Sequence, residues 1–172
     1  GHVVLSHGMN SSPAAAKVSA LAEVARGLGF RATLPDYRDL DAMQSVAYIP
    51  DRLMRLKEQV RGNGRLLLVG SSMGAFISGL ASLQLPCNGL FLMALPLTIT
   101  GFSQRFDAAL VPTTIVHGWE DELIPAMDVI EFAEKRRARL ILLPDNHRLS
   151  DHIDFTAKQF ELFLAQFMSA SR

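Results

Sequence analysis

The stretch Gly70-Ser71-Ser72-Met73-Gly74 is where the sequence offers a side chain that could act as a nucleophile. It follows the apolar run 65–70 and leads into further apolar residues, so we expect it to join a buried strand to a helix. A serine in such a tight turn needs glycines two positions before and after it, because larger side chains would collide. This favours Ser72 as a nucleophile above the sheet edge. Two alternatives stay open: Ser72 only caps the helix, or Ser71 is the nucleophile.

A serine hydroxyl is a weak nucleophile at neutral pH, so the hypothesis requires a general base and an acid that orients the base. Two later segments present such side chains where apolar strands end. The first, residues 116–125, presents three acids: Glu120, Asp121 and Glu122. The second, residues 142–152, presents two histidines: His147 and His152. The chain order serine, acid, histidine suits a serine, a carboxylate and a histidine that act together.

These loops must be positioned by strands. Four apolar runs lack the alternation of a half-exposed strand and are typical of parallel strands covered on both faces: 65–70, 89–95, 113–118 and 139–144. Residues 2–8 and 30–35 predict two further strands. Helical stretches lie between the strands, so we expect an α/β fold with one parallel sheet and helices on both faces.

Three helices can be read from apolar spacing. The first is expected to begin at Pro13 behind a Ser12 cap, with an apolar face of Val18, Leu21, Ala22, Ala25 and Leu28. The second is expected to begin near Tyr48, because Pro50 would interrupt an earlier start. The last has a core stripe of Ile153, Ala157, Phe160, Leu164 and Phe167. The charged segment 134–139 is expected to be a solvated helix end.

Composition narrows the classes of protein. Of 172 residues, 49% are apolar, and we expect residues 1–172 to form one domain with a sizeable core. The charges of the 17 basic and 17 acidic side chains cancel, so we do not expect nucleic acid or an anionic membrane as a partner. No apolar run is long enough for a membrane span, and the first residues lack the basic-then-apolar pattern of a leader, so we expect neither a span nor a leader among these residues. The single cysteine, Cys87, favours a reducing, cytoplasmic setting and is expected to be inert.

Metals and cofactors are not expected. The five histidines stand at scattered positions, namely 2, 7, 117, 147 and 152. His147 and His152 lack the spacing that would place two ligands on one helix face. The sequence also lacks a glycine-rich phosphate loop. A mechanism without a cofactor is therefore the simplest interpretation.

Four segments together resemble the motifs of one enzyme family. They are LSHGMNSSP (5–13), GSSMG (70–74), HGWEDELIP (117–125) and DNHRL (145–149). In this order they are similar to the oxyanion loop, the nucleophile elbow, the acid loop and the histidine loop of the α/β-hydrolase superfamily. The small members without a lid domain are the most similar. The resemblance covers the whole chain.

The resemblance implies roles for individual residues. Ser72 would be the nucleophile, Asp121 the orienting carboxylate and His147 the general base. The oxyanion hole would consist of two backbone N–H groups, those of Met9 and Met73. The resemblance assigns structural roles to His7 and His117 and places Glu120 and Glu122 in solvent. His152 would be a rival to His147 as the general base.

The resemblance also implies a six-stranded sheet in the order 2-1-3-4-5-6, because two strands usual in the superfamily are missing before residue 2. Residues 94–112, where many relatives insert a lid, are too few for a helical cap. Four apolar side chains of this segment could line a shallow substrate pocket beside Ser72, or pack beneath the segment: Leu95, Leu97, Phe102 and Phe106.

The predicted function is a serine hydrolase that cleaves a small ester or thioester through an acyl-enzyme on Ser72. Its partner would be a small-molecule acyl substrate. Two other functions use the same fold. An acyltransferase would pass the acyl group to an acceptor other than water, and a non-catalytic member would bind a ligand or a protein.

Overall fold

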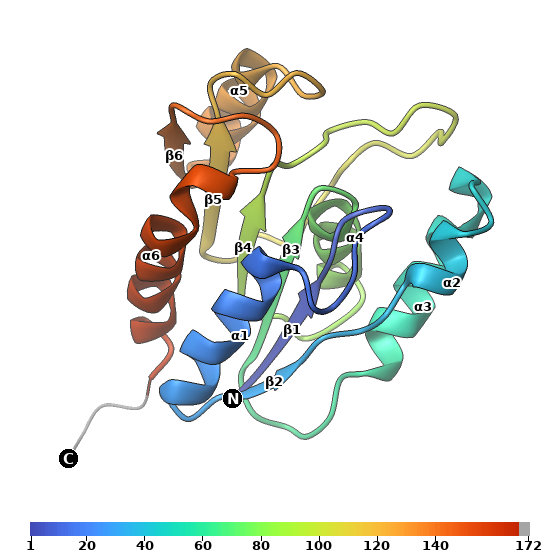
Figure 1. Ribbon diagram of the computed structural model, residues 1–172. Helices are drawn as coiled ribbons and strands as arrows, with labels where there is room; N and C mark the ends of the chain where they lie inside the picture. Colours follow the sequence, from blue (N-terminus) through green and yellow to red (C-terminus); the bar gives the residue numbers. More distant parts are fainter. Residues whose placement is uncertain (169–172) are drawn as a thin grey trace.

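Six parallel strands form one sheet in the order β2-β1-β3-β4-β5-β6 in the computed structural model, which describes residues 1–168 (Figure 1). The strands are β1 (His2–Ser6), β2 (Arg31–Thr33), β3 (Leu66–Ser71), β4 (Gly89–Met93), β5 (Thr113–Gly118) and β6 (Arg139–Leu143). All five pairings are parallel. The six predicted strands, their order and the fold class are confirmed.

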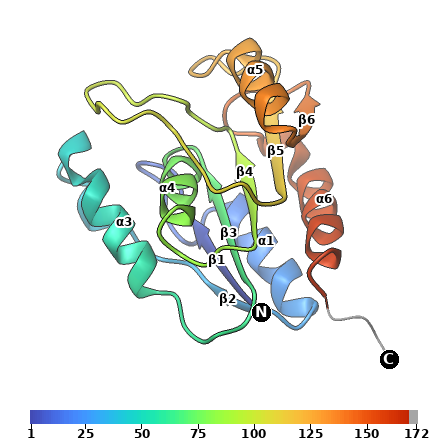
Figure 2. The same ribbon diagram turned by 180° about the vertical axis from the view of Figure 1, so that it is seen from behind.

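Helices cover both faces of the sheet. One face carries α1 (Ala16–Gly27) and α6 (Ile153–Ala165), which lie in front of the sheet in Figure 1. The other face carries α3 (Ile49–Glu58), α4 (Met73–Ser82) and α5 (Ala126–Arg136), which lie in front in Figure 2. Three short elements complete the chain: α2 (Arg38–Asp41), η1 (Val46–Tyr48) and η2 (Ser150–His152).

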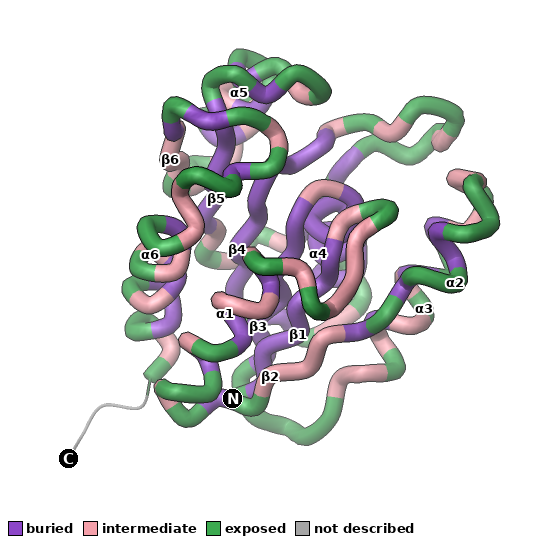
Figure 3. Tube along the Cα trace, in the orientation of Figure 1, coloured by how far each residue is buried: buried purple, intermediate pink, exposed green. Residues whose placement is uncertain are grey.

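Neighbouring strand residues point to opposite faces and build two separate cores. Val4 and Leu68 pack with side chains of α3, α4 and α5, whereas Leu5 and Val69 pack with side chains of α1 and α6. The central strands are therefore buried along their whole length (Figure 3). This double burial explains why β3, β4 and β5 read as continuous apolar runs.

The start of the first helix differs from the prediction. Helix α1 begins at Ala16 rather than Pro13, and Ala15 occupies the N-cap position without a capping side chain. Ser12 instead makes a turn: its Oγ accepts from the N–H of Ala14 at 3.2 Å and its carbonyl from Ala15 at 3.1 Å. Ser12 therefore stabilises a turn that precedes the helix and does not cap the helix itself.

The second and last predicted helices are present in the structure, but Phe167 of the predicted stripe lies beyond the end of α6. Helix α3 begins at Ile49, next to Tyr48, with Pro50 in its first turn. In α6 the residues Phe160 and Leu164 are fully buried. Helix α5 ends at Arg136, in the charged segment expected to close a helix.

The connection between β4 and β5, residues 94–112, contains no helix, so the fold has no lid domain. Phe106 of this connection packs against Phe76 of α4, with ring centroids 6.1 Å apart. Within residues 1–168, no helix has the length and apolar character needed to cross a membrane.

Candidate active site

Ser72 occupies a strained turn between β3 and α4. Its φ is +54° and its ψ −116°, a conformation that a non-glycine residue adopts only when its surroundings hold it there. The flanking glycines allow the turn. A Cβ on Gly70 would lie 2.1 Å from the carbonyl oxygen of Gly74, and a Cβ on Gly74 would lie 2.0 Å from that of Ser6. Glycine is therefore needed at both positions, because neighbouring backbone atoms leave no room for a Cβ. This agrees with the prediction that larger side chains would collide there.

A chain of two hydrogen bonds joins the three residues expected to form the catalytic group. Ser72 Oγ lies 3.0 Å from His147 Nε2, and His147 Nδ1 lies 2.8 Å from Asp121 Oδ2. The carboxylate can only accept, so Nδ1 carries the proton and donates it to Asp121. Nε2 is then free to accept the Ser72 hydroxyl proton. The three residues follow β3, β5 and β6, whose carboxyl ends meet at one edge of the sheet (Figure 1).

Asp121 is held as an anion by its surroundings. Its Oδ1 accepts from the backbone N–H groups of Leu123 at 2.9 Å and Ile124 at 2.8 Å. Burial by itself would raise the pKa of the Asp121 carboxyl, but the hydrogen bonds from His147, Ile124 and Leu123 together lower it below its ordinary value. His117 is buried beside it with Nε2 2.9 Å from the carbonyl oxygen of Ile124, which agrees with the structural role expected for it.

The loop that carries His147 is tied together by a second carboxylate. Asp145 accepts from Nδ1 of His152 at 2.9 Å, from the N–H of Asn146 at 2.7 Å and from the N–H of Asp151 at 3.2 Å. The rival histidine, His152, is therefore paired with Asp145, and His147 is the one that reaches Ser72. His147 also donates its backbone N–H to Glu122 Oε2 at 3.3 Å.

The loop after β1 lies directly against Ser72. A Cβ on Gly8 would stand 3.6 Å from Ser72 Cβ, so the peptide that follows Gly8 is near the hydroxyl. His7 shapes this loop, because its Nδ1 lies 2.7 Å from the Gly8 carbonyl oxygen and its Nε2 accepts from the N–H of Tyr37 at 2.9 Å. Met73 opens α4, where the first N–H groups have no partner within the helix.

Comparison with known proteins identifies the family. No protein-family model and no curated protein matches the chain. A solved structure from Xanthomonas campestris, of a protein assigned to the alpha/beta superfamily of hydrolases, matches with a TM-score of 0.92. It is 45% identical over 96% of this chain and 99% of that one. The chain belongs to the α/β-hydrolase superfamily.

Other solved structures resemble the chain at lower identity. Alpha/beta hydrolase domain-containing protein 10 from mouse is 18% identical with a TM-score of 0.76 and covers 97% of this chain and 90% of its own. The esterase PF2001 from Pyrococcus furiosus is 15% identical with a TM-score of 0.72 and covers 98% and 82%. At these identities the likeness concerns the fold.

The residues expected to line a pocket in this α/β hydrolase separate into two groups. Leu95 is fully buried in the core, so it packs beneath the connection and does not line an open pocket. Phe106 is also buried except for 8%, and it packs against Phe76 rather than beside Ser72. Leu97 and Phe102 are half-buried against that core and stay candidates for contact with a substrate.

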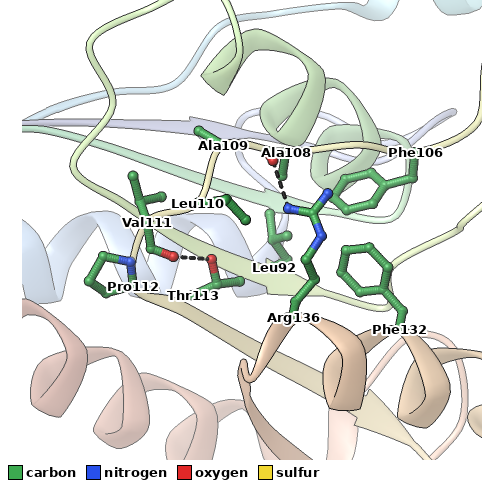
Figure 4. A pocket seen from close by; sticks show the side chains of 10 residues that line it. All are labelled: Leu92, Phe106, Ala108, Ala109, Leu110, Val111, Pro112, Thr113, Phe132 and Arg136. Atoms are coloured by element: carbon green, nitrogen blue, oxygen red, sulfur yellow. Dashed lines mark hydrogen bonds between the residues drawn. The ribbon is translucent and has the colours of Figure 1, made fainter.

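A cavity of about 230 Å³ lies away from this edge (Figure 4). It is formed by Phe106 and residues 108–113 together with Leu92, Phe132 and Arg136, and Ser72 is not among its lining residues. Arg136 spans one side of it by donating to the carbonyl oxygen of Ala108 at 2.8 Å. The cavity therefore does not belong to the candidate site.

Lys17 is a charged neighbour of the site that was not predicted from the sequence. Burial lowers the pKa of the Lys17 ammonium, on the first turn of α1, to about 8, although the charges of Asp145 and Asp121 act in the opposite direction. Lys17 thus contributes to the electrostatic field around both carboxylates. Lys17 stands one residue before the first buried side chain of α1. Nothing in that sequence position indicates that the lysine lies near Asp121 and Asp145.

The Asp145 loop predicts how stability depends on pH. Burial would raise the pKa of Asp145, but the hydrogen bonds from His152, Asn146 and Asp151 lower it below the ordinary value of 3.8. A carboxyl with a lower pKa in the folded state stabilises the protein above its ordinary pKa, and this stabilisation is lost as the pH falls through the folded value. Asp145→Asn should therefore lose less stability on acidification than wild type.

Urea unfolding between about pH 2 and 7 measures this difference, because the loss occurs below the ordinary pKa of the carboxyl. Asp128→Asn is the matched control, since Asp128 is an exposed residue of α5, and it should follow the wild-type profile. Identical acid slopes for Asp145→Asn and wild type would contradict the prediction.

Proposed function

We propose that the protein is a serine hydrolase that cleaves a small ester or thioester through an acyl-enzyme on Ser72. The observation that carries the proposal is the hydrogen-bonded chain from Ser72 Oγ through His147 to Asp121, with distances of 3.0 and 2.8 Å. This arrangement of hydroxyl, imidazole and carboxylate makes a weak nucleophile reactive at neutral pH.

In the proposed reaction, Ser72 Oγ attacks the carbonyl carbon while its proton passes to His147 Nε2. Asp121 stabilises the positive charge that forms on the imidazole. His147 then returns the proton to the departing alkoxide or thiolate, and the acyl group stays on Ser72. A water molecule activated by the same imidazole attacks this ester, which releases the acid and restores the hydroxyl.

The negative charge that develops on the carbonyl oxygen needs hydrogen-bond donors. We assign this role to the backbone N–H groups of Met73, at the start of α4, and Met9, in the loop beside Ser72. Two observations support the assignment: the N–H of Met73 has no partner within its helix, and Gly8 lies against Ser72. Such donors contribute most when they are fixed before the reaction begins.

The open site favours small or accessible acyl groups. Residues 94–112 form no helix that could cover Ser72, and the side chain of Met9, in the loop beside Ser72, is exposed. The structural likeness to the esterase PF2001 is compatible with ester substrates.

A fluorophosphonate probe tests the nucleophile. The activated hydroxyl should react rapidly, so mass spectrometry of the labelled peptide should find the probe on Ser72. Ser72→Ala should not be labelled, whereas Ser71→Ala should be labelled like wild type, because Ser71 is a buried residue of β3. A label on Ser71, or no label on folded wild type, would refute the assignment.

A further inference from the structure

A buried ion pair joins α2 to α3. These two helices lie at the right in Figure 1. Arg52 Nη2 donates to Asp41 Oδ1, and the two side chains are 1% and 5% exposed. Burial of two charges costs free energy that is recovered only if their other polar atoms are paired as well. Arg52 Nη1, however, is buried without a hydrogen-bond partner. The pair is therefore a weak source of stability.

The second oxygen of the Asp41 carboxylate gives the pair another role. Oδ2 accepts from the backbone N–H of Asn10 at 3.0 Å. Asn10 has a φ of +60°, in the left-handed region that few non-glycine residues adopt. It belongs to a turn that the N–H of Ser11 closes on the carbonyl oxygen of Gly8 at 3.2 Å. Met9 lies inside this turn, so the direction of its N–H depends on how the turn is held.

The same segment of chain fixes the other end of the turn. Tyr37, just before α2, donates its N–H to His7 Nε2, and Ser6 Oγ lies 2.9 Å from the Tyr37 hydroxyl. Residues 37–41 thus contact the loop on both sides of Met9. Of these contacts, the one from Asp41 comes from a charged group, which makes a stronger hydrogen bond than a neutral acceptor.

We propose that Asp41 is a positioning residue for the oxyanion hole. Its carboxylate, fixed from behind by Arg52, holds the Asn10 peptide and thereby aims the N–H of Met9 at the oxygen that becomes negative in the reaction. The inference rests on the proposed function, because it requires Ser72 to attack a carbonyl group. It predicts that Asp41 acts on the transition state rather than on substrate binding.

Two double variants separate this role from the ion pair. Asp41→Asn/Arg52→Met removes both charges but keeps an oxygen that can accept from the Asn10 N–H. Asp41→Leu/Arg52→Met removes the charges and the acceptor. With p-nitrophenyl acetate, kcat of the leucine variant should be about 10- to 100-fold below that of the asparagine variant, since loss of one oxyanion donor costs about 10²- to 10³-fold and a displaced donor costs less. KM should be nearly equal.

A neighbouring ion pair provides the matched control. Asp39 and Arg55 also join α2 to α3, with Nη2 2.9 Å from Oδ2, but they are more exposed and make no hydrogen bond to the loop at 7–10. Asp39→Asn/Arg55→Met should therefore keep the wild-type kcat. If the leucine variant does not fold, Asp41→Ala/Arg52→Met removes the same acceptor and carries the same expectation.

The outcomes distinguish the two proposals. Equal kcat values for the asparagine and leucine variants, in an enzyme whose activity is lost with Ser72→Ala, would overturn the positioning role alone. If wild type hydrolyses no more ester than Ser72→Ala does, the proposed function fails and the positioning role with it. A lower kcat in the leucine variant at unchanged KM, with a normal control pair, would support both.

Discussion

His147→Ala is expected to lower kcat for ester hydrolysis by about 10⁴- to 10⁶-fold, because the variant has no group that can take the Ser72 proton. Among residues 1–168, the His147 imidazole, 3.0 Å away, is the side chain that hydrogen-bonds the Ser72 hydroxyl. Asp121→Asn should lower kcat by about 10⁴-fold, since an amide can neither fix the same tautomer nor stabilise the imidazolium. Initial rates on p-nitrophenyl acetate measure both losses.

His152→Ala and Glu120→Gln are the controls for this experiment. His152 is paired with Asp145 rather than with Ser72, and Glu120 is exposed. Both variants should stay much closer to wild type than His147→Ala. If His152→Ala is the inactive variant instead, the assignment of the general base is wrong.

Gly74→Ala is expected to destabilise the protein strongly, because an added methyl group at this position collides with backbone beside Ser72. The new Cβ would lie 2.0 Å from the carbonyl oxygen of Ser6 and 2.8 Å from that of His7, and both are backbone atoms that cannot rotate away. Accommodation requires α4 to move off the end of β1, which opens the turn at Ser72. We expect a loss on the order of 4 kcal/mol in the free energy of unfolding and no measurable esterase activity.

Gly27→Ala is the matched substitution, because a Cβ there meets nothing within 4 Å. It lies at the end of α1, where alanine favours the helix slightly, so its melting temperature should equal or exceed that of wild type. Thermal unfolding followed by circular dichroism compares the two variants. Similar melting temperatures would mean that α4 can shift at little cost, against the geometry described above.

Much of this architecture could be predicted from the sequence for a physical reason. Strands buried on both faces must be apolar at every position, so β3, β4 and β5 stand out as continuous runs. The elbow at Ser72 also has a local signal, since the close approach of backbone at Gly70 and Gly74 excludes any side chain. Local constraints of this kind can be recognised from residues that are neighbours in the sequence.

Other features depend on contacts between distant residues and leave no such mark. Asp41 reads as an ordinary surface acid among charged neighbours, and only the folded chain brings Arg52 and Asn10 to it. Leu95 reads equally well as a pocket wall or as core, because both environments favour leucine. Ser12 and Pro13 are typical of the start of a helix, but the same residues also suit the turn that precedes α1.

The serine and the histidine of the candidate site are 75 residues apart in the sequence and meet only across the finished sheet. While the chain is being synthesised, Ser72 emerges long before β6 and His147 exist, and its hydroxyl is then an ordinary alcohol. In the proposed mechanism the Ser72 hydroxyl becomes reactive only after β6 has paired with β5 and its loop carries His147 to the serine. If Ser72 acts as proposed, a newly made chain cannot attack acyl compounds before β6 and its loop are in place.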